Sequence, residues 1–65
     1  MKITVNGNPH EVSDGNLAKA LITLGYGDAT VATAVNGQFV PGPARAAHTL
    51  NDGDSIEVLA PMQGG

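Results

Sequence analysis

The sequence predicts an α+β fold in which a mixed sheet of about four to five strands wraps around one short helix. Runs of alternating polar and β-branched residues recur along the chain, and tight-turn pairs such as Asn6-Gly7 and Asn36-Gly37 separate them. A single leucine stripe with helical spacing follows the first two runs. With 65 residues, the chain has room for one domain.

The N-terminal part of the chain predicts a β-hairpin. Residues 2–6 alternate polar and apolar side chains, as in a half-buried strand. Asn6-Gly7 favours a tight turn because both residues tolerate a positive φ. Residues 10–13 then form the returning antiparallel strand, and residues 14–16 break it and provide helix-capping side chains.

The middle of the chain predicts the helix. Leu17, Leu21 and Leu24 recur at spacings of four and three residues, which places them on one helical face. Gly25 and Gly27 end the helix, one of them in the left-handed cap position.

The C-terminal half predicts three more strands, over residues 31–35, 38–40 and 55–59. Asn36-Gly37 joins the first two, and the prolines of residues 41–43 end their pairing. Residues 44–50 are expected to form a loop or a short helical turn. A second tight turn, Asp52-Gly53-Asp54, leads into the last strand, after which Pro61 releases the chain.

The resulting order, β-β-α-β-β-β, fits the β-grasp arrangement best. In that fold the first and last strands lie side by side and parallel at the centre of the sheet. The apolar positions facing the helix predict the core: Ile3, Val5, Val12, Leu17, Leu21, Leu24, Val31, Val35, Val40, Leu50, Ile56 and Val58.

Gly64 and Gly65 indicate a slender tail at the end of the sequence. Because neither residue has a Cβ, the terminal carboxylate can enter a slot that any side chain would obstruct. We therefore divide the chain into a domain over residues 1–60 and a flexible tail over residues 61–65. Fully extended, such a tail reaches roughly 17 Å at about 3.3–3.6 Å per residue.

The sheet also predicts a surface for a partner protein. Leu59 points outward from the last strand, where a polar residue is usual. Ala32 and Ala34 face away from the core and allow another backbone to come close. With Phe39 and Met62 they are expected to form an apolar patch beside the tail.

Composition excludes several functions. The chain has no cysteine and a net charge of −3, which argues against thiol chemistry and nucleic-acid binding. His10 and His48 do not make a metal site, and no serine or threonine has a motif that pairs it with a base, so we expect neither a metal nor a catalytic residue. The absence of a membrane-length apolar run and of a signal-peptide pattern predicts a cytoplasmic protein.

The sequence resembles the ThiS family, the sulfur carrier proteins of thiamine biosynthesis. The likeness extends over essentially the whole chain, including the leucine helix that ends at Gly25. Its other segments are Ile3-Thr4-Val5-Asn6-Gly7, Ala34-Val35-Asn36-Gly37-Gln38-Phe39-Val40-Pro41, Leu50-Asn51-Asp52-Gly53-Asp54-Ser55-Ile56-Glu57 and Pro61-Met62-Gln63-Gly64-Gly65.

The sequence differs from the family pattern at Gly42, where the family often has arginine. We expect the contacts of that arginine to be either absent here or taken over by Arg45.

This resemblance implies a ubiquitin-like β-grasp carrier that is a protein co-substrate and not an enzyme. By this resemblance, a ThiF-like activating enzyme is expected to adenylate Gly65 with the use of ATP and magnesium. A persulfide donor then supplies sulfur, and thiazole synthase (ThiG-like) removes it from the resulting thiocarboxylate. Gly65 is thus the reacting residue, and the tail segment that enters the partner enzymes consists of Pro61, Met62, Gln63 and Gly64.

Three alternatives remain open at this stage. The same terminus suits a sulfur carrier of another pathway, such as a molybdopterin-type pathway, or a ubiquitin-like modifier that becomes attached to lysines. A non-covalent interaction module with an idle tail is the third.

Overall fold

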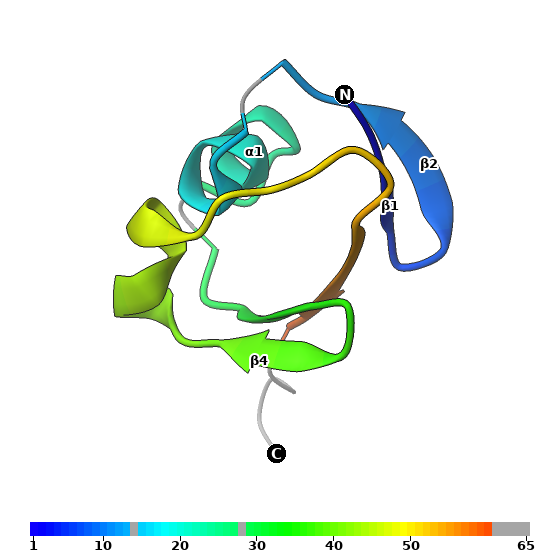
Figure 1. Cartoon of the computed structure of the whole chain (residues 1–65). Coiled ribbons are helices and arrows are strands. Elements are labelled where there is room, and N and C mark those ends of the chain that lie inside the picture. Colours follow the sequence, from blue (N-terminus) through cyan, green and yellow to red (C-terminus); the bar gives the residue numbers. More distant parts are fainter. Residues whose placement is uncertain (14, 28, 61–65) are drawn as a thin grey trace.

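A computed structural model describes residues 1–13, 15–27 and 29–60 of the chain. The elements follow the predicted β-β-α-β-β-β order, with a 3₁₀ helix, η1, inserted before the last strand (Figure 1). Their bounds are β1 Lys2–Val5, β2 Asn8–Glu11, α1 Leu17–Thr23, β3 Ala32–Val35, β4 Gln38–Val40, η1 Gly42–Ala47 and β5 Ser55–Leu59.

The five strands form one mixed sheet in the order β2-β1-β5-β3-β4. The last strand, β5, lies in the middle, where it pairs parallel with β1 and antiparallel with β3. The predicted β-grasp fold and the parallel pairing of the first and last strands are therefore confirmed. This topology makes β5 the element from which the C-terminal residues leave the domain.

Two Asn-Gly turns close the two hairpins. Asn6 and Asn36 both have a φ of 51°, and the glycines that follow them have φ values of 84° and 83°. Positive φ at both central residues matches the right-handed twist of the flanking strands, which is why asparagine and glycine are favoured there. The sequence had predicted that the second strand begins at His10. Because the first turn has only two residues, β2 instead begins at Asn8.

The helix begins and ends where its capping residues indicate. The side-chain oxygen of Asn16 accepts a hydrogen bond from the backbone N–H of Lys19 at 3.1 Å. After the helix, Gly25 adopts a φ of 97°, which side chains with a Cβ disfavour. Leu17, Ala20 and Leu21 are buried against the sheet.

The core lies between α1 and the inner face of the sheet. Most of the predicted core residues are buried, but Leu24 and Val31 are only partly buried and pack at its margin. The reason is their position, because Leu24 caps the helix and Val31 precedes β3. The buried apolar residues are Ile3, Val5, Val12, Leu17, Ala20, Leu21, Val35, Val40, Leu50, Ile56 and Val58.

The segment after β4 forms the 3₁₀ helix η1, which begins at Gly42, two residues before the predicted loop or helical turn. Proline stands in its first turn, where its missing N–H costs no helical hydrogen bond. The Asn16 side chain donates to the Ala46 carbonyl at 2.5 Å, and this bond ties η1 to the start of α1. None of the helices among the described residues is long and apolar enough to cross a membrane.

Candidate functional site

The predicted partner-surface residues come together on the outer face of the sheet. Ala32 is the register partner of Leu59, and Ala34 is the partner of both Glu57 and Phe39. Directly paired residues project to the same face of a sheet. We call the face that carries these five residues the open face; α1 packs on the opposite face (Figure 1).

The open face exposes two large apolar side chains. Phe39 is 68% exposed and Leu59 is 73% exposed, whereas Ala34 between them is half-buried. The short alanine side chains leave a hollow of about 330 Å³ on this face. It is lined by Asn6, Ala32, Thr33, Ala34, Phe39, Glu57, Val58 and Leu59.

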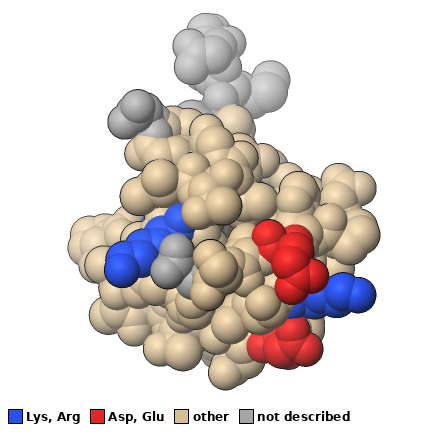
Figure 2. All heavy atoms as spheres, turned by 90° about the horizontal axis from the view of Figure 1, so that it is seen from above, with Lys and Arg blue, Asp and Glu red and all other residues tan. Residues whose placement is uncertain are grey.

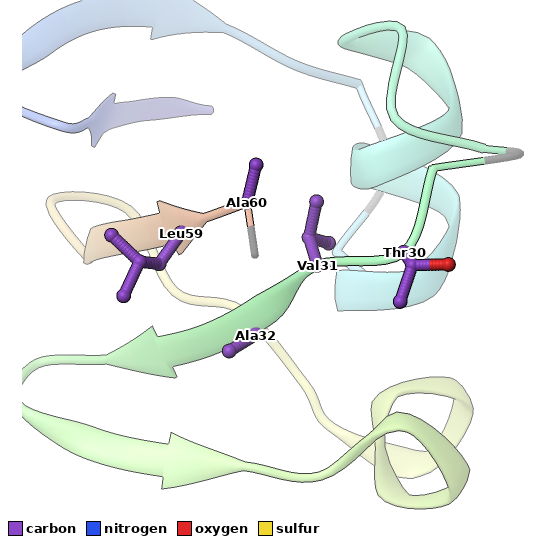
Figure 3. Close-up of a pocket in the computed structure, with 5 residues that line it drawn as sticks. All are labelled: Thr30, Val31, Ala32, Leu59 and Ala60. Atoms are coloured by element: carbon purple, nitrogen blue, oxygen red, sulfur yellow. The ribbon is translucent and has the colours of Figure 1, made fainter. Parts of the chain in front are cut away.

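A second hollow continues the apolar surface towards the end of β5. It has a volume of about 280 Å³ and lies between the start of β3 and Ala60 (Figure 3). Its lining residues are Thr30, Val31, Ala32, Leu59 and Ala60. Ala32 and Leu59 line both hollows, so the surface extends from the sheet centre to the last described residue.

Charge is sparse around this surface. Of the residues that line the two hollows, one is charged. Figure 2 shows another side of the molecule, the side of α1 and the N-terminus, where a few acidic and basic side chains lie on a largely uncharged surface. Glu57 is the acidic residue of the open face and is exposed beside Ala34. The salt bridge found within the described ranges joins the N-terminal amine and Glu11. Glu11 lies on the edge strand β2, at the side of the sheet opposite to β4. The open face is therefore suited to an apolar partner surface.

Asp54 has the one resolved pKa shift among the described residues. It directly precedes β5, at the end of the strand opposite to Leu59. Hydrogen bonds from the backbone N–H of Asn51 at 2.8 Å and the side-chain amide of Asn36 at 2.9 Å lower the pKa of Asp54 below its usual value. Both donors stabilise the carboxylate form. This shift is a property of the turn before β5 and does not involve the open face.

Arg45 holds η1 to β3 from the inner side of the sheet. Its Nε donates to the Thr33 hydroxyl at 2.9 Å, and a terminal guanidinium nitrogen donates to the Val31 carbonyl at 2.5 Å. Thr33 is buried, and its hydroxyl in turn donates to the Val40 carbonyl at 2.9 Å. Sequence reasoning had not identified this network, although it had named Arg45 in relation to Gly42. A Cβ added at Gly42 would meet nothing within 4 Å.

Asn6 has a role that sequence reasoning also missed. Its side chain binds the backbone of Val58, near the end of β5, through two hydrogen bonds. The sequence showed Asn6 only as a turn residue, because nothing local indicates a partner so far along the chain.

The tail residues of the predicted site, namely Pro61, Met62, Gln63, Gly64 and Gly65, lie outside the described residues. Within residues 1–13, 15–27 and 29–60, the structure groups no three His, Cys, Asp or Glu side chains that could hold a metal ion.

Comparison with known proteins identifies related sequences and structures. The model of the ThiS family matches residues 3–65. A comparison with curated proteins finds no match. The crystal structure of the thiamine biosynthesis protein ThiS from Geobacter metallireducens has 36% sequence identity and a TM-score of 0.83, with 100% of each chain covered.

A solution structure of a thiamine biosynthesis protein from the same organism is also similar. It has 35% identity and a TM-score of 0.77, and the alignment covers 100% of this chain and 88% of that one.

Proposed function

The chain belongs to the ThiS family, and from this premise we propose that it is a sulfur carrier of thiamine biosynthesis. The observation that carries the proposal is the extent of the family match, which runs through the domain and on to Gly65. Two similar solved structures are thiamine biosynthesis proteins, which supports the same pathway. In this role the protein is a carrier and co-substrate, and partner enzymes provide the catalysis.

The carried sulfur resides on the carboxyl carbon of Gly65 as a thiocarboxylate. The chain has no cysteine, and methionine sulfur is a thioether that cannot be handed over as sulfide. An α-carboxyl group has a pKa of about 3.3–3.7, so it is ionised near neutral pH. A carboxylate attacks phosphorus readily but is itself a poor acyl electrophile, so it needs activation before sulfur can be attached.

Activation forms an acyl adenylate. One carboxylate oxygen of Gly65 attacks the α-phosphorus of ATP, and pyrophosphate leaves. This step needs magnesium and cationic groups around the phosphates. We assign both to a ThiF-like adenylating enzyme, because the chain has only Lys2, Lys19 and Arg45 as permanent cations and Arg45 is engaged with β3.

Sulfur loading and delivery follow from the acyl adenylate. A persulfide donor attacks the carbonyl carbon through its outer sulfur, expels AMP and forms an acyl disulfide. A thiol then attacks the inner sulfur, which leaves the thiocarboxylate on Gly65 and a disulfide on the donor side. Thiazole synthase removes this sulfur in the last step.

The open face provides the docking surface for the adenylating enzyme. Phe39 and Leu59 are anchors of the kind that fill partner pockets, and Ala32 and Ala34 permit close approach between them. Pro61, Met62, Gln63 and Gly64 form the segment that takes Gly65 into the partner's active site. Five extended residues span roughly 17 Å at about 3.3–3.6 Å each.

Intact-mass spectrometry tests the proposal. The protein is incubated with a ThiF-like enzyme, ATP, magnesium and a persulfide donor, and a parallel sample lacks ATP. We expect the complete mixture alone to give a mass gain that equals the replacement of one oxygen by sulfur. A matched variant with one alanine added after Gly65 should keep its fold and stay unmodified.

Other outcomes point to other functions. An unchanged mass with an enzyme known to be active would overturn the proposal. ATP-dependent adducts on lysines of other proteins that survive reducing agent would indicate a protein modifier. Sulfur transfer to a molybdopterin precursor but not to thiazole synthase would indicate a carrier of that pathway.

A further inference from the structure

The two strands that flank β5 do not support it over the same length. β1 ends at Val5, where the turn begins, whereas β5 continues past its pairing with β1 as far as Leu59. The backbone N–H of Asn6 donates to the Ile56 carbonyl at 2.9 Å and is the last backbone group of this ladder. Beyond it, the backbone N–H and carbonyl of Val58 face the turn, and no residue of β1 lies opposite Val58.

The side chain of Asn6 takes the place of the missing strand residue. Its Oδ1 accepts from the Val58 N–H at 2.9 Å, and its Nδ2 donates to the Val58 carbonyl at 3.1 Å. A carboxamide carries the same donor and acceptor as a peptide group, so one side chain satisfies both backbone groups. On the other side of β5, Leu59 pairs with Ala32. The strand is thus held on both sides almost to Ala60.

The second Asn-Gly turn provides an internal comparison. Asn36 has the same φ of 51°, and its side chain also forms two hydrogen bonds. However, it binds the Ser55 N–H and the Asp54 carboxylate, at the beginning of β5. The two asparagines therefore hold opposite ends of the same strand, and only Asn6 holds the end from which the tail leaves.

We infer that Asn6 is a positioning residue for the tail: its clamp on Val58 fixes the point where the chain leaves the sheet, and so sets how Gly65 reaches a partner docked on the open face. This inference rests on the proposed function. Without the clamp, the edge of β5 that faces β1 is unsupported from Val58 onward. The end of β5 would then be held by its pairing with β3 alone, so the point from which the tail leaves the sheet would be less fixed.

The expected effect is on the chemical step and less on docking. A less firmly oriented arm brings its end to a fixed site less often, and we expect kcat for adenylation to fall roughly 3- to 10-fold. KM should change little, because Phe39 and Leu59 remain in place. Asn6 also lines the hollow of the open face, so a direct contact with the partner would instead raise KM.

Asn6→Gly and Asn36→Gly form the matched test. Glycine keeps the positive φ of each turn, and each variant loses two side-chain hydrogen bonds. The rate of adenylation by a ThiF-like enzyme is measured from the release of pyrophosphate. Backbone amide hydrogen exchange is measured at Val58. We expect Asn6→Gly to lower kcat and speed exchange at Val58, whereas Asn36→Gly keeps the wild-type kcat.

Asn6→Asp is the second variant, in case the glycine variant folds poorly. The carboxylate still accepts from the Val58 N–H but cannot donate to its carbonyl, so kcat should fall between wild type and Asn6→Gly. Equal kcat values in the Asn6 and Asn36 variants would overturn the inference, as would unchanged exchange at Val58. Failure of the wild-type protein to be adenylated would instead refute the proposed function and, with it, this inference.

Discussion

The two faces of β5 carry apolar side chains for different reasons. On the inner face, Ile56 is fully buried and Val58 is 8% exposed, because both belong to the hydrophobic core. On the open face, Leu59 is 73% exposed and lies next to alanines that leave a hollow. Folding explains the first set but not the second. An apolar residue that folding does not require is evidence for a binding surface, and the following experiments test that distinction.

The largest effect is expected from the inner face. Ile56→Ala removes a fully buried side chain, and the cavity should lower the free energy of unfolding by about 2–5 kcal/mol. Leu59→Ala on the same strand should change it by less than about 0.5 kcal/mol. Urea unfolding of both variants measures the difference. Similar losses of unfolding free energy in the two variants would contradict the proposed difference between the faces.

Thr33→Val tests the polar exception on the inner face. Valine has nearly the same shape but leaves Arg45 Nε and the Val40 carbonyl without the hydroxyl that links them. We expect a loss of about 1–3 kcal/mol in unfolding free energy, because the unpaired groups are partly or fully desolvated. Arg45→Met serves as the companion variant. If the hydroxyl acts through Arg45, the double variant should lose less than the sum of the two single variants.

The open face should respond in binding and not in stability. Phe39→Ala combined with Leu59→Ala should raise KM for adenylation about tenfold, which corresponds to ~1.4 kcal/mol. The free energy of unfolding should stay within about 0.5 kcal/mol of the wild-type value. Ile22→Ala is a matched control, because Ile22 is also exposed, at 64%, but lies on the helix. An equal rise in KM for Ile22→Ala would show that the open face is not the docking surface.

The smallest effect concerns pH and the turn that precedes β5. The folded-state pKa of Asp54 is lowered by the Asn51 N–H and the Asn36 amide, so its carboxylate stabilises the fold above the unfolded-state pKa. That stabilisation is lost as pH falls through the lower folded-state value. Asp54→Asn should therefore be less stable than wild type at neutral pH, and the gap should narrow in acid. Thermal unfolding at a series of pH values measures it, and a constant gap would contradict the shift.

Much of the fold could be predicted because its signals are local. The turn pairs Asn6-Gly7 and Asn36-Gly37 fix both hairpins, and the alternation in β5 gives its bounds and its two faces. Leu24 and Val31 show the limit, because apolar identity does not tell whether a residue sits in the core or at its margin.

The parts of the site that could not be predicted depend on long-range geometry. Asn6 meets Val58 only after β1 and β5 pair, and Arg45 reaches Thr33 only after η1 folds back on β3. Neither partner is encoded by spacing. Asparagine in a turn is explained by its backbone conformation alone, so its side-chain partner leaves no trace in the local sequence.

The central position of β5 also governs how the domain is made. The β1–β2 and β3–β4 hairpins are not neighbours in the sheet, and β5, which is translated last, pairs with both. A nascent chain on the ribosome can form the hairpins early, but the sheet stays in two pieces until residues 55–59 have emerged. The hydrogen bond between the Thr4 N–H and the Asp54 carbonyl joins residues that are far apart in the sequence. Forming such contacts requires a long loop to close, which slows folding. We therefore expect prematurely terminated products that lack β5 to remain unfolded and to be sensitive to proteolysis.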